Sequence, residues 1–142
     1  MKAKIGKCCI TILLLLLIIS GMKTYNFIFP KAKSMELPVL EKISSIEIKK
    51  GAISTEHRDK EIINTIINGF FKAKPTRNLT IHDTPSLKEY YAITFISEGD
   101  DRVYTSFIYN EDAKWYIEQP YYGVYEIKEE LFDFIVTSYQ KN

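Results

Sequence analysis

Hydrophobic residues form one unbroken run near the start of the chain and are interspersed with polar residues everywhere else. Residues 8–22 (CCITILLLLLIISGM) carry no charge, and Lys2, Lys4 and Lys7 precede them. A short basic region followed by an apolar run is typical of a segment that targets a protein for export. The pattern predicts a single hydrophobic helix within residues 1–29.

Length and flanking residues disagree about whether this segment is retained. The run of fifteen residues would span about 22 Å as a helix, less than a hydrocarbon core of about 30 Å, which favours a cleaved signal peptide. However, no small-x-small cleavage triplet closes the run, and apolar character resumes after Lys23. We favour a retained anchor that contacts the membrane through residues 5–29, and secretion after cleavage is the alternative.

The charges that flank the run predict its orientation. Cytoplasmic flanks of membrane segments carry an excess of lysine and arginine, so the very short basic tail favours an N-terminus inside the cell. Lys23, Lys31 and Lys33 nearly balance that tail without reversing the preference. We therefore expect a single-pass protein of the cell membrane whose C-terminal part lies outside.

The stretch that follows the apolar segment lacks a hydrophobic period. Residues 30–41 include two prolines and charges of both signs, a composition typical of a linker. Residues 42–142 have the length of one ordinary domain. The predicted organisation is thus an anchor or signal peptide (1–29), a linker (30–41) and an extracytoplasmic domain (42–142).

Two hydrophobic periods alternate in the domain. Alternating apolar and polar residues predict strands, and short connections between them imply antiparallel neighbours. Apolar residues at helical spacing predict one helix from a cap at Ser54 or Thr55 to about Lys74, and a second that includes Leu131 and Ile135. The expected strands are residues 43–49, 90–97, 103–109 and 114–118, with weaker signals at 78–81 and 124–127.

This order predicts an α+β, two-layer domain with an antiparallel sheet of about four to five strands and two helices on one face. The helix residues Ile62, Ile66 and Phe70 are expected to contact the sheet. On the opposite face we expect Tyr90, together with Tyr104, Ile108 and Tyr116. The predicted core partners in the sheet and last helix are Ile46, Ile48, Ile93, Phe95, Leu131 and Ile135.

Charge and cysteine usage exclude several functions for the domain. Six of the nineteen basic residues and none of the eighteen acidic ones precede residue 35, so residues 35–142 carry 13 − 18 = −5 charges. Such a domain lacks the basic surface that nucleic-acid binding requires, whereas cationic peptides would be attracted. Cys8 and Cys9 both lie in the N-terminal segment, which leaves the domain without disulfides or thiolate metal sites.

Two pairs of residues could in principle support catalysis. His82 beside Asp83 could act as a base, alone or with His57, and Glu118 and Glu126 could serve as paired carboxylates. Neither pair belongs to a recognisable motif, and no nucleophile or phosphate-binding loop accompanies them. Surface side chains explain them more simply, so we predict no catalytic residue and no enzyme.

Acidic side chains also gather in two predicted hairpin turns, at residues 98–101 and 110–112. These turns lack the spacing of a calcium-binding loop, and acidic residues are common in turns for conformational reasons. We predict no metal and no cofactor.

One segment of the sequence is specific enough to suggest a family. Residues 116–125 read YIEQPYYGVY, and Asp83-Thr84-Pro85 and Lys88-Glu89-Tyr90 precede them. The chain resembles, over roughly residues 43–135, a domain-of-unknown-function family of bacilli and clostridia numbered fifty-three-oh-one, whose pattern has a DTP-like turn and a YIEQPYxGIY-like segment. That resemblance implies a short exported or membrane-linked protein of a Gram-positive bacterium and assigns no catalytic residue. Lys128 departs from the acidic residue expected at the start of the last helix, and Val124 replaces an isoleucine.

Tyrosines are the remaining functional signal. Aromatic side chains with a polar tip suit binding surfaces, although they could equally complete a small core. We expect residues 119–125 to form a rigid turn shaped by its proline and glycine, with Tyr122 more exposed than Tyr121. The predicted partner-binding residues are Tyr90, Tyr104, Tyr116, Pro120, Tyr121, Tyr122, Gly123 and Tyr125.

The sequence therefore favours a non-catalytic, membrane-tethered, extracytoplasmic binding or modulating module. Its partner could be a peptide, an envelope component or a membrane protein, and not nucleic acid. A cell-surface hydrolase and a structural spacer without a ligand are the alternatives.

Overall fold

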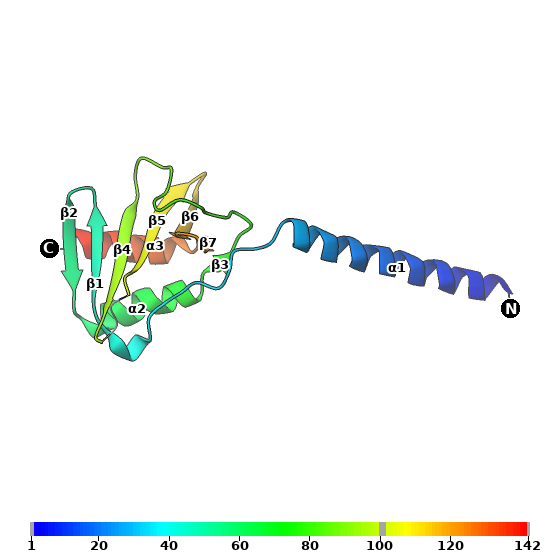
Figure 1. Ribbon diagram of the computed structural model, residues 1–142, viewed down its shortest axis with the longest axis horizontal. Coiled ribbons are helices and arrows are strands. Elements are labelled where there is room, and N and C mark those ends of the chain that lie inside the picture. Colours follow the sequence, from blue (N-terminus) through cyan, green and yellow to red (C-terminus); the bar gives the residue numbers. More distant parts are fainter. Residues whose placement is uncertain (1, 100–101, 142) are drawn as a thin grey trace. The chain divides into compact units, whose positions relative to one another are not determined.

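A computed structural model describes the backbone of residues 2–99 and 102–141 and the side chains of residues 12–99 and 102–141. It divides the chain into two units, Met1–Lys31 and Ala32–Asn142. The predicted N-terminal helix is confirmed as α1, Lys2–Ile28 (Figure 1). Among the residues with described side chains, no helix is long and apolar enough to cross a membrane. The structure does not describe the side chains of Cys8 and Cys9, nor any part of Asp100 and Asp101.

The second unit is built on one antiparallel sheet of seven strands in the order β2-β1-β4-β5-β6-β7-β3 (Figure 1). This confirms the α+β class, but the sheet has more strands than the four to five expected. The strands are β1 (Ile43–Lys50), β2 (Ile53–His57), β3 (Lys74–Pro75), β4 (Tyr91–Ser97), β5 (Tyr104–Glu111), β6 (Lys114–Gln119) and β7 (Gly123–Ile127). The helices are α2 (Lys60–Phe71), α3 (Glu129–Gln140) and the short 3-10 helix η1 (Leu40–Lys42).

Strand β2 replaces the expected start of the first helix. Gly51, at φ +60°, reverses the chain after β1, and the next residues then pair with β1. The helix begins instead after Asp59, whose carboxylate accepts hydrogen bonds from the backbone N–H groups of Glu61 (2.7 Å) and Ile62 (3.4 Å). Pairing with β1 satisfies the backbone groups on one side of β2, which is an edge strand, and aspartate caps a helix as well as serine or threonine does, so the predicted cap was wrong.

The end of that helix and the strand expected after it also differ from the prediction. Helix α2 stops at Phe71, and β3 pairs with Glu126 and Tyr125 of β7. Residues 78–81 do not form a strand. The N–H of Val124 still donates to the carbonyl of Asn78 (3.0 Å) there, beside β3.

The core lies between one face of the sheet and helices α2 and α3. The ring centroids of Phe70 on α2 and Phe95 on β4 lie 5.2 Å apart in an edge-to-face arrangement, and Tyr91 on the same face contacts Phe132 and Tyr139 of α3. Both helices therefore cover the same face, and α3 contacts both β1 and β6 as it crosses the strands (Figure 1). The predicted core residues are buried together, except that Ile62 and Leu131 are only partly buried.

Two residues assigned to the outer face in fact point into this core. Tyr104 pairs with Phe95, and Ile108 pairs with Tyr91. Directly paired residues of neighbouring strands share a face, so both lie on the helix side, where they are buried. The register between β4 and β5 decides this orientation, and a one-residue error in register reverses every side chain.

Candidate functional site

The predicted rigid turn is present between β6 and β7. The N–H of Tyr122 donates to the carbonyl of Gln119 at 3.1 Å, which closes a four-residue turn with Pro120 in its second position. Tyr121 occupies the third position at φ +65°, the conformation that a type II turn requires there. Its hydroxyl donates to the carboxylate of Asp83 at 2.5 Å, and this bond raises the pKa of Tyr121.

The turn binds the segment that precedes the domain. We name residues 32–36 the strap; they form part of the stretch expected to be a linker. The side chain of Gln119 accepts a hydrogen bond from the N–H of Glu36 (2.8 Å) and donates one to its carbonyl (2.7 Å). The Tyr125 hydroxyl donates to the carbonyl of Lys33 at 2.6 Å, and the Lys33 N–H donates to the carbonyl of Tyr122 at 3.2 Å. The strap is thus hydrogen-bonded to the turn at Lys33 and at Glu36.

A carboxylate and a glycine complete this attachment. The carboxylate of Glu36 accepts a hydrogen bond from the Tyr122 hydroxyl. It also forms an ion pair with the guanidinium group of Arg102 at 3.0 Å. A Cβ on Gly123 would lie 2.5 Å from the Cβ of Ala32, so a glycine is needed for the strap to approach. The bond to Glu36 raises the pKa of Tyr122, and burial raises that of Tyr125 to about 12.

Exposure within the turn is opposite to the prediction. Tyr121 is 58% exposed, whereas Tyr122 is only partly exposed because its hydroxyl reaches the strap. Tyr125 is 2% exposed and belongs to the core. In residues 119–125, the side chains of Gln119, Tyr122 and Tyr125 therefore bond to the strap, and Tyr121 is the tyrosine that faces solvent.

The other tyrosines predicted to bind a partner do not form a continuous surface with the turn. Tyr104 is in the core, as described above. On the outer face, the ring centroids of Tyr90 and Phe107 lie 5.2 Å apart in an edge-to-face arrangement, and those of Tyr116 and Tyr109 lie 5.8 Å apart. Tyr90 and Tyr116 are both partly buried.

The side chains considered for catalysis are dispersed or already bonded. His57 is 9% exposed on edge strand β2, whereas His82 is exposed in the long loop before β4. Glu118 is buried and accepts a hydrogen bond from Tyr109 (3.3 Å), whose pKa is raised by burial and by this carboxylate. Glu126 forms an ion pair with Lys114 at 3.6 Å.

Neither His82 with Asp83 nor Glu118 with Glu126 lines one pocket together. Among the side chains of residues 12–99 and 102–141, no cluster of three histidine, cysteine, aspartate or glutamate residues could hold a metal ion.

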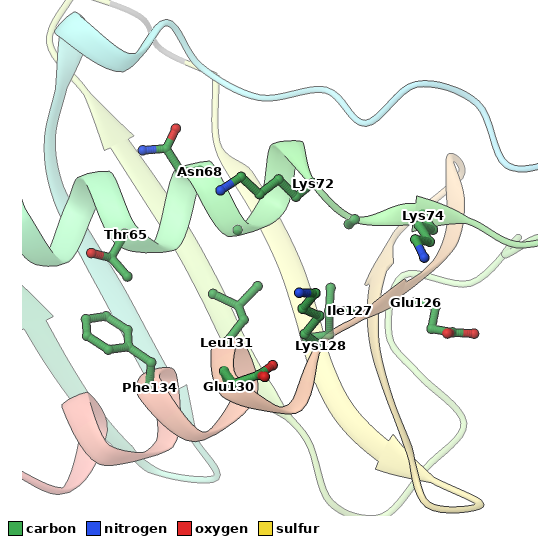
Figure 2. A pocket seen from close by; sticks show the side chains of 12 residues that line it. Thr65, Asn68, Lys72, Lys74, Glu126, Ile127, Lys128, Glu130, Leu131 and Phe134 are labelled. Carbon is green, nitrogen blue, oxygen red and sulfur yellow. The ribbon is translucent and has the colours of Figure 1, made fainter.

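A groove that the sequence did not predict opens between helices α2 and α3, beside the end of β7. It has a volume of about 510 Å³. Figure 2 shows Leu131 at its centre, with Phe134 beside it on α3 and Lys128 reaching up between the two helices. Lys72 on α2 and Lys74 on β3 lie along the other side. The groove thus combines an apolar floor with several ammonium groups.

Local sequence explains why the groove forms here. Gly69 lies in the last turns of α2, and a Cβ there would come within 2.4 Å of Leu131, so the missing side chain lets the helices approach. Lys128 precedes α3 at the N-cap position, where its ammonium group has no acceptor atom with which to cap the helix, and its side chain lines the groove instead. A glycine inside a helix and the departure of Lys128 from the family pattern were the signals that could have revealed the groove.

Comparisons with known proteins cover most of this domain. The family model DUF5301, described as "Domain of unknown function (DUF5300)", matches residues 31–126. A protein from Ruminococcus gnavus solved by NMR is 36% identical, with a TM-score of 0.56, over 68% of this chain and 96% of its own. No curated protein matches the chain. The family match begins and ends earlier than the expected range of 43–135, and it includes the strap.

Proposed function

Since the chain belongs to the DUF5301 family, whose description names no activity, we propose from its geometry that it is a non-catalytic binding module tethered at the outer face of a cytoplasmic membrane. The observation that carries this proposal is the groove between α2 and α3. Its volume of about 510 Å³ falls in the range of about 300–1,000 Å³ that is usual for binding sites. Its apolar floor with a few polar groups is also the usual composition of such sites.

The membrane tether in this proposal rests on the N-terminal segment. Leu13–Leu17 are each more than half exposed on α1, and insertion of this apolar surface into a bilayer would remove it from water. The basic residues before this segment favour an outward-facing domain. Whether the segment is retained or cleaved after export does not alter the proposed role of the groove.

The groove suits recognition better than the tyrosine turn does. The turn already holds the strap through Gln119, Tyr122 and Tyr125, so a partner would have to compete with those bonds. In the groove, Leu131 and Phe134 are only partly buried and are free to lose further surface to a ligand. Tyr121 remains available at the turn as an exposed aromatic side chain.

A cell-surface hydrolase is less well supported. The carboxylates that line the groove are Glu126, which pairs with Lys114, and Glu130 on the first turn of α3. Neither histidine lines the groove. A spacer without a ligand is the stronger rival, because the attached strap gives the domain a defined exit point for its tether.

Site-specific crosslinking on living cells tests the proposal. A photo-crosslinking amino acid at Thr65 would face the groove, whereas the same residue at Asn64 is also exposed but points about 100° away around the helix. We expect covalent adducts with one partner from position 65 and none from position 64. Changing Asn68, which also lines the groove, to tryptophan should fill the groove and abolish the adducts from position 65. Equal adducts from both positions, or none from either, would refute the groove as a recognition surface.

A further inference from the structure

The groove carries a local charge opposite to that of the domain around it. Lys72, Lys74 and Lys128 line it, whereas residues 35–142 together carry −5 charges. In the described part of the chain, no carboxylate forms an ion pair with any of these three lysines. Unpaired cations grouped on an otherwise acidic domain indicate a negatively charged occupant.

We propose that this groove binds an amphipathic helical segment that carries acidic residues beside its apolar face, a proposal that rests on the groove's being the recognition surface. The apolar part of such a segment would cover Leu131 and Phe134, and its carboxylates would reach the three ammonium groups. Lysine suits this arrangement because its long stem lies along apolar surface while its charge stays in water.

The shape of the groove favours a helix as the occupant. The C-terminal half of α2 and the N-terminal half of α3 line it, so the two helices run antiparallel on either side. An amphipathic helix that places its apolar face between two such helices is a common mode of peptide recognition. A small anion would leave the apolar floor exposed.

The acidic residues of the groove do not cancel its positive side. Glu126 is paired with Lys114 at 3.6 Å and is therefore partly neutralised. Glu130 lies in the first turn of α3, where the positive end of the helix dipole partly offsets its charge, and the three lysines outnumber the two glutamates of the groove. An acidic peptide would thus meet mainly the ammonium groups of Lys72, Lys74 and Lys128.

A synthetic peptide provides the direct test. The probe is a fluorescent helical peptide of roughly 18 residues, five turns, with leucine on one face and glutamate on the other. It is titrated by fluorescence anisotropy against the full-length chain in phosphatidylcholine nanodiscs, with empty nanodiscs as the blank. Otherwise identical peptides carry glutamine or lysine in place of glutamate.

We expect the glutamate peptide to bind about tenfold or more tightly than the glutamine peptide, because exposed ion pairs are individually weak but add up. The lysine peptide should bind the groove least, so that any attraction it has to the acidic remainder of the domain is unaffected when Asn68 is changed to tryptophan. Lys72→Glu/Lys128→Glu should abolish the preference for glutamate, whereas Lys42→Glu/Lys88→Glu, the same charge change at exposed positions outside the groove, should leave it intact.

Two results would overturn the inference in different ways. If the glutamine and glutamate peptides bind equally and both are lost when Asn68 is changed to tryptophan, the groove binds helices without regard to charge; the acidic class is then wrong and the proposed function stands. If no peptide binds and position 65 gives no adduct on cells, both proposals are wrong.

Discussion

Replacing Gln119 with alanine should release the strap from the domain. The side chain of Gln119 is 5% exposed and makes two hydrogen bonds to the backbone of Glu36, at 2.8 and 2.7 Å. A typical protein hydrogen bond contributes about 0.5–1.5 kcal/mol net, so losing both costs about 1–3 kcal/mol. At about 1.4 kcal/mol per tenfold, the population of released strap should rise roughly 5- to 150-fold.

Limited trypsin digestion measures that population. Trypsin cleaves after lysine, and Lys33 lies within the strap with its N–H and its carbonyl both hydrogen-bonded to the turn. Proteolysis follows the equilibrium population of the open form when opening and closing are fast relative to cleavage. Cleavage after Lys33 in the full-length chain should therefore accelerate by about the same roughly 5- to 150-fold factor in Gln119→Ala, as seen by mass spectrometry of the fragments.

Tyr121→Phe is the matched control for this experiment. It removes a hydroxyl from the same turn, but that hydroxyl contacts Asp83 and not the strap. It should leave cleavage after Lys33 unchanged. If Gln119→Ala is cleaved no faster than the unaltered chain, Gln119 does not hold the strap, and the interpretation of residues 119–125 as an attachment site is wrong.

Four further predictions test the fold, the turn and the tether. Truncating the fully buried Ile66 to alanine should cost about 2–5 kcal/mol in urea denaturation, and an unchanged midpoint would place α2 in solvent. Gly123→Ala should lower the melting temperature, because Gly123 has φ +136° and the new Cβ would meet Ala32; an unchanged melting temperature would show that the strap does not pack there. Folding raises the pKa of Tyr125 from 10.0 to about 12. The stability contributed by the neutral Tyr125 hydroxyl should therefore be complete below about pH 10 and be lost as the pH rises through 12. Tyr125→Phe should reduce this loss of stability at high pH, and identical pH profiles for the two proteins would contradict the prediction. Protease added to intact protoplasts should remove the domain, whereas full protection would place the domain inside the cell.

The side-chain pattern by itself was sufficient for the elements whose signal is local. Alternation located β1 and β4 to β6 with small errors at their ends, and helical spacing identified Ile66 and Phe70 as core residues. The unbroken apolar run likewise predicted helix α1. These features succeed because a helix or strand buries residues at its own period, which depends on neighbours only a few positions away.

The sequence was sufficient to recognise residues 116–125 as typical of the family, but it did not predict their structural role. Residues 119–125 were expected to present tyrosines to a partner, and the structure instead bonds Gln119, Tyr122 and Tyr125 to the strap. The two sides of this contact are 83 to 92 positions apart in the chain. No local pattern encodes which polar side chain will satisfy which distant backbone group.

Only the tertiary structure decided the position of β2, the inward orientation of Tyr104 and the existence of the groove. Pairing with β1 overrode the capping preference of Ser54 or Thr55, and it buries Thr55 and His57, two residues apart, on one face of the sheet. The register between β4 and β5 turned Tyr104 into the core. The groove needs Gly69 beside Leu131, two residues that are adjacent only once both helices pack on one sheet. Such contacts arise from packing between distant parts of the chain, which a sequence pattern constrains only weakly.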